Sequence, residues 1–353
     1  MNNVTHHVEQ EVKKMSTPPS LCDLPNELAI NIFNILGLKS IQTLRKVCRD
    51  LRNRIDDIKP VVNLSYVRID VSDCKIQFYY ESAIQTLDVE ESEDPVEYEK
   101  TVESGRSIVR SDRSEKIVNG DFLELASRDL QLILKFQKKI IKSISLVNGT
   151  KYSNNFQQFL ENLKSFLPFE NPLLKVDNFQ IKTNDQKSVI TPLSLTDPQS
   201  IYSIKFFNWN GNNRPMDIAE IMEMEQWKNA KRFVSDFIIT GIFAHNFRHF
   251  SVFDVHFQSI SAKYLLDLKK IFQNSTDAKH FRIRYKTFGD REQFFEKMGP
   301  AVTFEDGYED RFEWYFRMST TDDDVLSIGL KDRSITLLRR SVQHVSEDAV
   351  IQN

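Results

Sequence analysis

Three histidines in the second half of the chain come closest to a metal site by type and spacing. His245 and His249 are four positions apart and His256 follows nearby. On a helix, a four-residue spacing places two imidazoles on one face, where they could bind zinc. No glutamate completes the pattern of a zinc protease, and phenylalanines surround the histidines in the sequence. The pattern is therefore more typical of packed or surface histidines than of metal ligands.

Two other groups of residues invite a catalytic interpretation. Asp322, Asp323 and Asp324 imitate a magnesium cluster, but an isolated acidic turn between β-prone runs is usually only solvated. Cys48 lies on the apolar side of an expected helix, where a thiol is more often a small buried hydrophobic group than a nucleophile. The sequence contains no GxSxG, Walker or GxGxxG motif. We therefore predict no catalytic residue, no metal and no cofactor.

Composition limits the remaining classes of protein. The chain has 353 residues, of which 40% are hydrophobic and 11% aromatic, and this is ample for a packed core. Lysine and arginine total 47 against 50 acidic residues, so the net charge gives no general attraction to nucleic acid or membrane. No apolar run reaches the roughly 18 residues of a membrane span. Three cysteines without a CxxC pair, and no apolar leader, predict a soluble protein of the cytosol or nucleus.

Residues 1–20 are predicted to be a flexible tail, and ordered structure is expected to begin after them. Pro25 suits the first turn of a helix, Gly37 suits a left-handed cap that ends it, and Ser40 suits the start of a second helix. The first helix is apolar on two sides, which carry Leu28, Ile32, Ile35 and Leu36 and, opposite, Ala29, Ile30 and Phe33. A unit of about 40 residues rarely folds on its own core. The pattern alone leaves open whether a partner or the rest of this chain covers the second side.

The second helix is expected to have an apolar stripe and a strongly basic opposite side. Segment 21–60 resembles an F-box in the residues Leu24, Pro25, Glu27, Leu28, Ile32, Leu36, Ser40, Leu44, Arg45, Val47, Cys48, Arg49 and Leu51. Many F-boxes have tryptophan at position 51, where this chain keeps an apolar leucine. The resemblance implies a small trihelical unit that binds a Skp-type adaptor and, through it, a cullin scaffold. The residues implied to contact or position the adaptor are Leu24, Pro25, Leu28, Ile32, Leu36, Leu44, Arg45, Val47 and Leu51.

Segment 61–119 is predicted to be a small β-hairpin region followed by an acidic linker. Alternating β-prone runs lie around 67–71, 76–80 and 84–89. From Asp88 the sequence is acidic and then polar as far as Gly120, without an apolar period. Such runs usually repel one another and stay solvated, so we favour a loop over a site for basic partners.

Helix-like and strand-like stretches alternate from Asp121. Helices are expected at 121–139, 154–167, 216–231 and 261–274, and strands at 140–147, 174–181, 201–209, 233–239, 251–257 and 281–285. Several strands recur about 26 to 33 residues apart, a period typical of repeat proteins. One helix-strand unit cannot bury its own apolar face, so stacked units and a curved parallel sheet are predicted. A doubly wound sheet is the competing layout, but it normally brings a glycine-rich turn, and this chain has only ten glycines.

The C-terminal part predicts antiparallel strands that close the sheet. Runs around 312–318, 325–330 and 334–338 are expected to cap its open end. Residues 341–353 are predicted to be a frayed tail. The fold class is therefore predicted as α+β or α/β, with a trihelical F-box, a leucine-rich-repeat-like α/β solenoid arc over 120–340 and antiparallel β capping segments.

Region 120–340 resembles the FTH domain of the nematode F-box A family. The resemblance lies in the phrases EMEQWKNAKRF, HNFRHFSVFDVHFQSISAKYLLDLKKIF and TDPQSIYSIKFF. Its most specific residues are Gln226, Trp227, Lys228, Ala230 and Lys231. The family implies a non-catalytic adaptor subunit of an SCF-type ubiquitin ligase, whose C-terminal domain binds a target protein.

Other functions remain open beside the adaptor. A scaffold or regulator would bind protein through the same arc without recruiting a ligase. An RNA-binding module would use the basic and aromatic segment 280–288, although alternate residues of a strand point to opposite faces of a sheet. Tryptophans can anchor a binding face, but of Trp209, Trp227 and Trp314 at least two, Trp227 among them, are expected in the core.

Overall fold

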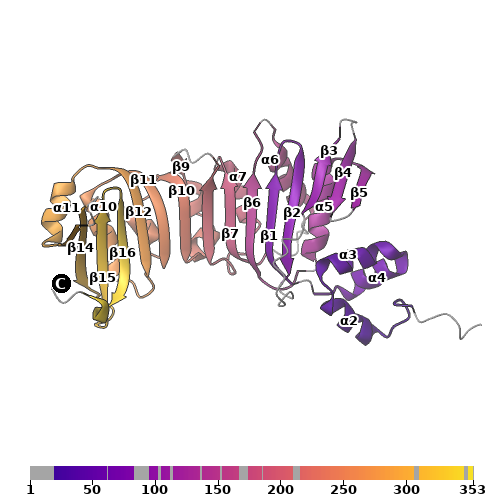
Figure 1. Cartoon of the computed structure of the whole chain (residues 1–353), viewed down its shortest axis with the longest axis horizontal. Helices are drawn as coiled ribbons and strands as arrows, with labels where there is room; N and C mark the ends of the chain where they lie inside the picture. The colour runs from indigo at the N-terminus through magenta and orange to yellow at the C-terminus, as the bar shows by residue number, and fades with distance from the viewer. Residues whose placement is uncertain are drawn as a thin grey trace, which may run out of the picture. The chain divides into compact units, whose positions relative to one another are not determined.

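The computed structural model describes residues 20–61, 63–82, 95–101, 105–111, 114–135, 137–151, 153–166, 174–184, 186–209, 215–305, 310–345 and 349–352. The predicted tail up to residue 19 and the β-prone run at 84–89 lie outside these ranges. The chain divides into two compact units, of which one holds the N-terminal helices and the other holds most of the β-sheet (Figure 1). Helices at the N-terminus are thus followed by a large, mostly β-stranded region, as the sequence predicts.

Three short helices form the N-terminal unit. They are α2 (Asn26–Ile35), α3 (Leu38–Val47) and α4 (Arg49–Ile58). The pattern of the residues predicts two helices, and the extra break lies at Cys48, whose backbone is extended (φ −153°, ψ 167°). The Cys48 Sγ accepts a hydrogen bond from the backbone N–H of Leu51 at 3.4 Å and so caps α4. Its side chain is exposed, and the prediction of a buried apolar thiol is therefore wrong.

The helix boundaries differ from those predicted by the capping residues. Pro25 precedes α2 as its N-cap residue, and Gly37 precedes α3 in the same way. The Gly37 backbone is extended (φ −69°, ψ 166°), not left-handed as predicted. Because α3 begins at Leu38 and not after Ser40, both Leu38 and Ile41 are buried, and this apolar burial favours the earlier start.

The second unit is built around a continuous sheet, which has 17 strands in the described residues. Its central strands pair in parallel in the order β1, β6, β7, β8, β10, β11 and β12. These strands are β1 (Leu64–Val71), β6 (Ile141–Asn148), β7 (Val176–Thr183), β8 (Ser203–Asn208), β10 (Arg232–Thr240), β11 (Val252–Ile260) and β12 (His280–Phe288). Parallel neighbours in a sheet need crossover connections, and helices supply most of them here.

The connections between the parallel strands carry most of the helices. They are α5 (Phe122–Lys135), α6 (Asn155–Phe166), α7 (Lys187–Ser194), α8 (Ala219–Met222), α9 (Glu225–Asn229), the 3₁₀ helix η1 (Ala244–Phe247) and α10 (Ala262–Gln273). The helix predicted over 216–231 is in fact a short strand, β9 (Pro215–Asp217), followed by two helical pieces. The extended Met224 separates α8 from α9. This break lets Ile221 and Trp227 both lie in the core.

One apolar row crosses the parallel strands in register. It consists of Val67, Ile144, Phe179, Ile204, Phe233, Phe253 and Phe281. Each of these side chains is at most 4% exposed. The last two phenylalanines of the row meet aromatic residues of η1 and α10. Phe253 lies 4.4 Å from Phe247, ring centroid to centroid, and Phe281 lies 4.8 Å from Phe272. This row is the core between the sheet and the helices.

Antiparallel strands extend the sheet on both sides of the parallel run. On one side lie β2 (Lys75–Ser82), β3 (Val96–Lys100), β4 (Arg106–Ser111) and β5 (Ser114–Asn119). On the other side β12 pairs with β16 (Ser334–Ser341), followed by β15 (Asp324–Lys331), β14 (Asp310–Arg317) and β13 (Val302–Glu305). The C-terminal antiparallel strands agree with the sequence prediction.

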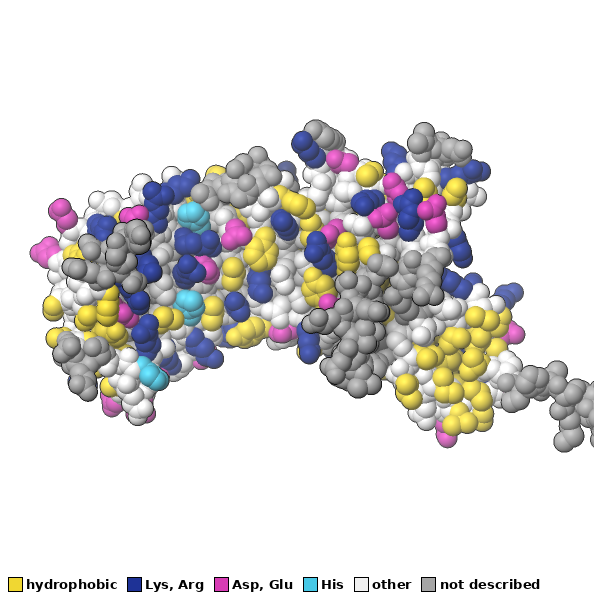
Figure 2. Space-filling model, in the orientation of Figure 1, with side chains coloured by type: hydrophobic (Ala, Val, Ile, Leu, Met, Phe, Trp, Pro, Cys, Tyr) yellow, Lys and Arg dark blue, Asp and Glu magenta, His cyan; other side chains and the backbone are white. Residues whose placement is uncertain are grey.

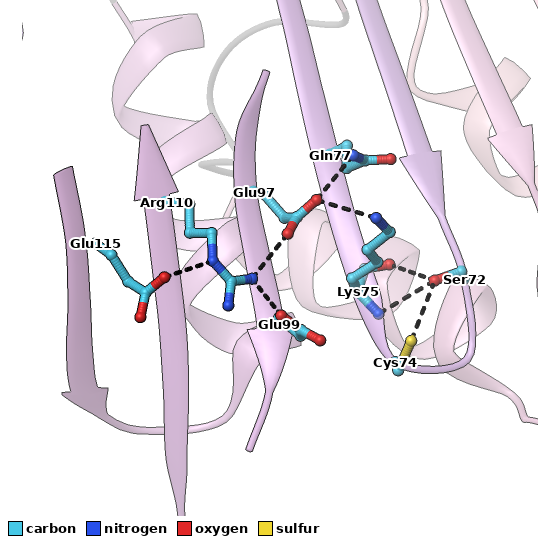
Figure 3. A network of polar contacts seen from close by, with 8 residues as sticks. All are labelled: Ser72, Cys74, Lys75, Gln77, Glu97, Glu99, Arg110 and Glu115. Carbon is cyan, nitrogen blue, oxygen red and sulfur yellow. Dashed lines mark hydrogen bonds and ion pairs between the residues drawn. The ribbon is translucent and has the colours of Figure 1, made fainter. Parts of the chain in front are cut away.

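The predicted linker after the hairpin is wrong for Val96–Lys100, Arg106–Ser111 and Ser114–Asn119, which form β3, β4 and β5. These strands show little apolar alternation because few of their side chains are buried, among them Tyr98 and Ser107. A network of charges holds one surface of this meander (Figure 3). The Arg110 guanidinium bonds to Glu97 at 3.0 Å, to Glu115 at 2.8 Å and to Glu99. Glu97 also accepts bonds from Lys75 at 3.1 Å and Gln77 at 2.8 Å.

The charge of Glu97 is expected to make this meander sensitive to acid. Partial burial alone would raise the pKa of Glu97, but its hydrogen bonds with Lys75 and Arg110 outweigh burial and lower the pKa. A lowered pKa in the folded state gives stability that is present above the unfolded pKa and is lost as the pH falls through the folded value. We expect Glu97→Gln to be less stable than the wild type at neutral pH. The difference should shrink as the pH falls below about 4.3, the ordinary pKa of glutamate, and vanish below the lowered pKa of Glu97 in the folded state.

Urea unfolding over a pH series measures this difference. Glu115→Gln is the control, because the Glu115 side chain is 60% exposed and exposed ion pairs contribute little. A destabilisation by Glu97→Gln that persists unchanged in acid would contradict the assignment.

The C-terminal residues are more ordered than the predicted frayed tail. A 3₁₀ helix, η2 (Val342–His344), follows β16, and β17 (Ile351–Gln352) pairs in parallel with β14. The Gln352 side-chain amide donates a hydrogen bond to the carbonyl of Pro300 at 3.2 Å. The chain end is thereby fixed to the loop after α11 (Arg291–Met298).

Candidate docking surfaces

Helix α2 exposes apolar side chains on the face turned away from its core. Ala29 and Phe33 are fully buried, whereas Leu28 is 51%, Ile32 36% and Ile35 72% exposed. The exposed residues have the spacing i, i+4 and i+7, which places them on one side of the helix. We call Leu28, Ile32 and Ile35 the α2 stripe. Figure 2 shows an extended hydrophobic surface over the N-terminal helices.

Val47, at the end of α3, is also exposed. It is 64% accessible, although it continues the apolar pattern of its helix. Exposed apolar residues gathered in so small a unit usually mark an interaction surface. Of the contact residues predicted from the sequence, Leu28, Ile32 and Val47 lie at the surface, Pro25 is exposed, and Leu24, Leu36 and Leu44 are half-buried. Ile35 was not among them, although its place in the apolar pattern could have indicated it.

Two of the predicted contact residues are engaged inside the unit. Leu51 is buried together with Ile55, one turn further along α4, so it can act only by positioning other residues. Arg45 bonds to Asp56 through two hydrogen bonds of 3.0 Å. This bidentate pair ties α3 to α4. Arg45 is therefore a structural cation as well as a predicted contact.

Arg54 fixes the segment that leads into α2. Its guanidinium donates hydrogen bonds to the backbone carbonyls of Leu21, at 3.3 Å, and of Cys22 and Leu24. It also reaches the side-chain oxygen of Asn26 at 3.4 Å. Five guanidinium N–H groups in a fixed geometry suit such a set of carbonyls. The sequence shows Arg54 only as one of several basic residues, and its role in positioning Leu24 is a finding of the structure.

The three histidines lie on different elements. His245 lies in η1, His249 follows η1, and His256 lies on β11, so no α-helix aligns the first two. A ring nitrogen of His249 lies 3.0 Å from the carbonyl oxygen of Trp227, and burial lowers the pKa of His249. Over the described ranges, no group of three or more His, Cys, Asp and Glu residues is arranged to hold a metal ion. His249 instead completes the packing around Trp227.

Two of the three tryptophans are core residues, as predicted. Trp227 and Trp314 are 2% and 1% exposed. The Trp227 ring packs against Phe233 and Phe250, at centroid distances of 4.6 and 5.0 Å. Trp209 is exposed, with the Lys182 ammonium 4.2 Å from the centre of its ring.

The segment proposed for RNA binding is strand β12. Of its aromatic residues, Phe281 and Tyr285 are buried and are not available to stack on bases. The half-buried Phe288 packs against Tyr285 and Phe294. Arg282 and Lys286 are exposed on the opposite face. Arg284 lies 3.1 Å from Asp254. The strand therefore presents charges without the aromatic platform that single-stranded RNA requires.

Two family models match this arrangement of helices and sheet. The F-box domain model matches residues 21–63, which include all three N-terminal helices. The FTH domain model matches residues 153–297, from α6 to α11. The chain is an F-box protein with an FTH domain. The resemblance predicted from the sequence is thereby confirmed.

One similar protein is itself described as an F-box protein. F-box A protein 224 of Caenorhabditis elegans is 23% identical over 285 residues, which are 78% of this chain and 68% of that protein. An F-box implies, in general, the role of a substrate adaptor of an SCF-type ligase. Among the described residues, no helix is both long and apolar enough to cross a membrane.

Proposed function

We propose that this F-box protein is a non-catalytic substrate adaptor of an SCF-type cullin-RING ubiquitin ligase. Its F-box binds a Skp-type adaptor, and its FTH domain binds a target protein. The observation that carries the proposal is the α2 stripe, because Leu28, Ile32 and Ile35 are apolar, exposed and aligned on one face. An aligned apolar face of this kind suits packing against the helices of a partner. We place the protein in the cytosol or nucleus, which its three free thiols support.

The contact surface proposed for the Skp-type adaptor extends from the α2 stripe to neighbouring residues. Pro25 and Val47 are exposed, and Leu24, Leu36 and Leu44 present parts of their side chains. Leu51 and Arg45 support this surface from within the unit. Lys46 and Arg49 are exposed and would attract an acidic adaptor surface, which mainly raises the association rate.

The mechanism we propose is proximity. By holding a target close to a charged conjugating enzyme, the adaptor converts a bimolecular encounter into an effectively intramolecular one. The protein itself then forms and breaks no covalent bond. The domain that holds the target is proposed to span residues 120–340, wider than the matched FTH model, and to form a leucine-rich-repeat-like arc. The sequential pairing of β6, β7 and β8, and then of β10, β11 and β12, supports this interpretation.

Binding of a purified Skp-type adaptor to the full chain tests the proposal. Exchanging Ile32 and Ile35 for aspartate places two charges in the α2 stripe. Loss of a central anchor costs roughly 2 kcal/mol, so we expect the Kd to rise at least about 30-fold. Calorimetry or a pull-down with quantified recovery measures it, and circular dichroism checks that the fold is kept.

A matched control uses two isoleucines outside the F-box. Ile117 and Ile140 are 66% and 51% exposed, so Ile117→Asp with Ile140→Asp changes the charge equally without touching the α2 stripe. Equal affinity of both double variants for the adaptor would remove the ligase assignment. A scaffold or regulator that recruits no ligase would then be the better description.

A further inference from the structure

A hollow lies on the face of the sheet that points away from the apolar row, near its C-terminal end. Four residues cross this hollow in register, and they are Arg282 on β12, Thr336 on β16, Gly329 on β15 and Glu313 on β14. The two middle positions carry the smallest side chains and the outer two carry long ones. The result is an open depression of about 260 Å³. We call it the basic hollow.

The basic hollow carries an excess of positive charge. Among the described residues that line it, the permanently charged cations are Arg282, Arg311, Lys331 and Arg340, and one residue, Glu313, carries a carboxylate. This is four positive charges against one negative charge, a local net charge of +3, in a chain whose net charge is −3. Figure 2 shows lysine and arginine side chains gathered over this part of the sheet.

Glu313 cannot neutralise the surrounding cations. Its side chain is 3% exposed and lies 3.2 Å from Arg311 and 3.5 Å from Arg340. The hydroxyl of Ser327 donates to it at 2.6 Å. A single carboxylate thus holds two guanidinium groups in place, and both remain about one-third exposed. They are positioned at low entropic cost for a further anion.

The edge of the basic hollow toward β11 carries charges of both signs. Asp254 lies 3.9 Å from Arg282 and 3.1 Å from Arg284, and Asp236 lies 3.5 Å from Arg284. Burial lowers the pKa of His280, Asp254 opposes this, and Arg282 and Arg232 add to it. Arg282 lies farther from its carboxylate than Arg284 does and is 49% exposed, so it is the guanidinium that this edge offers to an anion.

The spacing of the cations favours several charges in a row over one compact anion. From Arg282 on β12 to Arg311 on β14 the sheet advances by three strand spacings, which is about 14 Å. One phosphate reaches only part of this distance. We propose that the basic hollow binds an extended segment, rich in Asp and Glu, of the protein that this adaptor captures. The proposal rests on the proposed function, because it names the chemical class of the target.

Fluorescence anisotropy with the full chain tests the proposal. The probe is a labelled peptide of about 12 residues in which Asp and Glu alternate, long enough in extended form to cross the hollow. We expect saturable binding that weakens as salt is added. Arg282→Glu with Arg340→Glu is expected to raise the Kd at least about tenfold. Lys263→Glu with Lys297→Glu makes the same change in net charge at exposed positions on α10 and α11 and is expected to leave the Kd unchanged.

A second variant removes the space and keeps the charges. A Cβ at Gly329 would meet no atom within 4 Å, and isoleucine suits a strand. The Gly329→Ile variant should therefore fold normally and bind the peptide more weakly than the wild type does. Failure of the wild type to bind the peptide, or an equal loss in both double charge variants, would overturn the proposal.

Two competing ligands and a binding measurement with the Skp-type adaptor serve as further controls. Tighter binding of a peptide with one phosphoserine and no other acid, or of a short oligouridylate, would also overturn the proposal. The Arg282→Glu and Arg340→Glu variant is expected to keep its affinity for the Skp-type adaptor. Loss of peptide binding alone concerns the basic hollow, whereas loss of adaptor binding by the wild type concerns the proposed function.

Discussion

Replacing Phe253 with alanine is expected to lower the free energy of unfolding of the sheet by about 3 to 5 kcal/mol. Phe253 is fully buried in the apolar row. Its ring lies 4.1 Å from that of Phe281 and 4.4 Å from that of Phe247, centroid to centroid. Truncation therefore removes contacts with the next strand and with η1 at once, and it leaves a cavity that the parallel strands cannot easily close.

Chemical denaturation followed by tryptophan fluorescence measures this effect, because Trp227 and Trp314 are buried in the same unit. Phe243→Ala is the control. It makes the same chemical change ten positions away, at a side chain that is 68% exposed, and is expected to alter stability by less than about 0.5 kcal/mol. Equal effects of the two substitutions would show that the apolar row is not the core of the sheet.

Replacing Phe33 with alanine is expected to unfold the F-box. Phe33 is a fully buried residue of a small unit. A loss of about 3 to 5 kcal/mol is comparable to the whole stability of a core of this size. The amides of α2, α3 and α4 should then exchange rapidly with deuterium, and binding of the Skp-type adaptor should be lost. The transition of the sheet should stay close to that of the wild type.

The Ile35→Ala variant distinguishes a loss of F-box folding from a loss of contact with the adaptor. Ile35 is 72% exposed, so its truncation should leave amide protection in the F-box unchanged. It should still weaken binding of the Skp-type adaptor. If Phe33→Ala kept both protection and binding, the assignment of Phe33 to the core of this unit would be wrong.

The parallel strands could be predicted because alternate residues along each strand are buried, and this gives their sequences a two-residue period of apolar side chains. Phe233, Phe253 and Phe281 each begin a run in which alternate residues are buried. Helix α10 is equally clear, since the Ser261 hydroxyl accepts a hydrogen bond from the Tyr264 N–H at its start. Local pattern and final environment agree in these elements.

Elements without such a period could not be predicted. Strands β3 to β5 depend on Arg110 and its acidic partners. In the sequence alone, a segment so rich in charges has the pattern of a solvated loop. Helix α7 contains Pro192 and has no side-chain cap, so its sequence lacks the usual signals of a helix. The break at Cys48 depends on a thiol in the place of the usual hydroxyl or carboxylate cap.

The candidate sites, like the fold, could be predicted only in part from the sequence. The apolar surplus of α2 indicates a contact surface, and Leu28 and Ile32 are indeed exposed, but the pattern could not show that Leu51 is buried. The basic hollow could not be predicted at all. Its cations come together because β12 pairs with β16 and not with the next strand along the chain. Such long-range pairing leaves no trace in local sequence spacing.

The outer strand of the N-terminal meander has one more consequence. Within the described residues β5 pairs only with β4, which leaves its other edge open to a strand from a second molecule. Glu115 and Lys116 are exposed there, and charges on an edge oppose such an addition. Replacing both with valine would give neighbouring molecules a matching apolar border next to Ile117, and growth into open-ended fibres is the expected result.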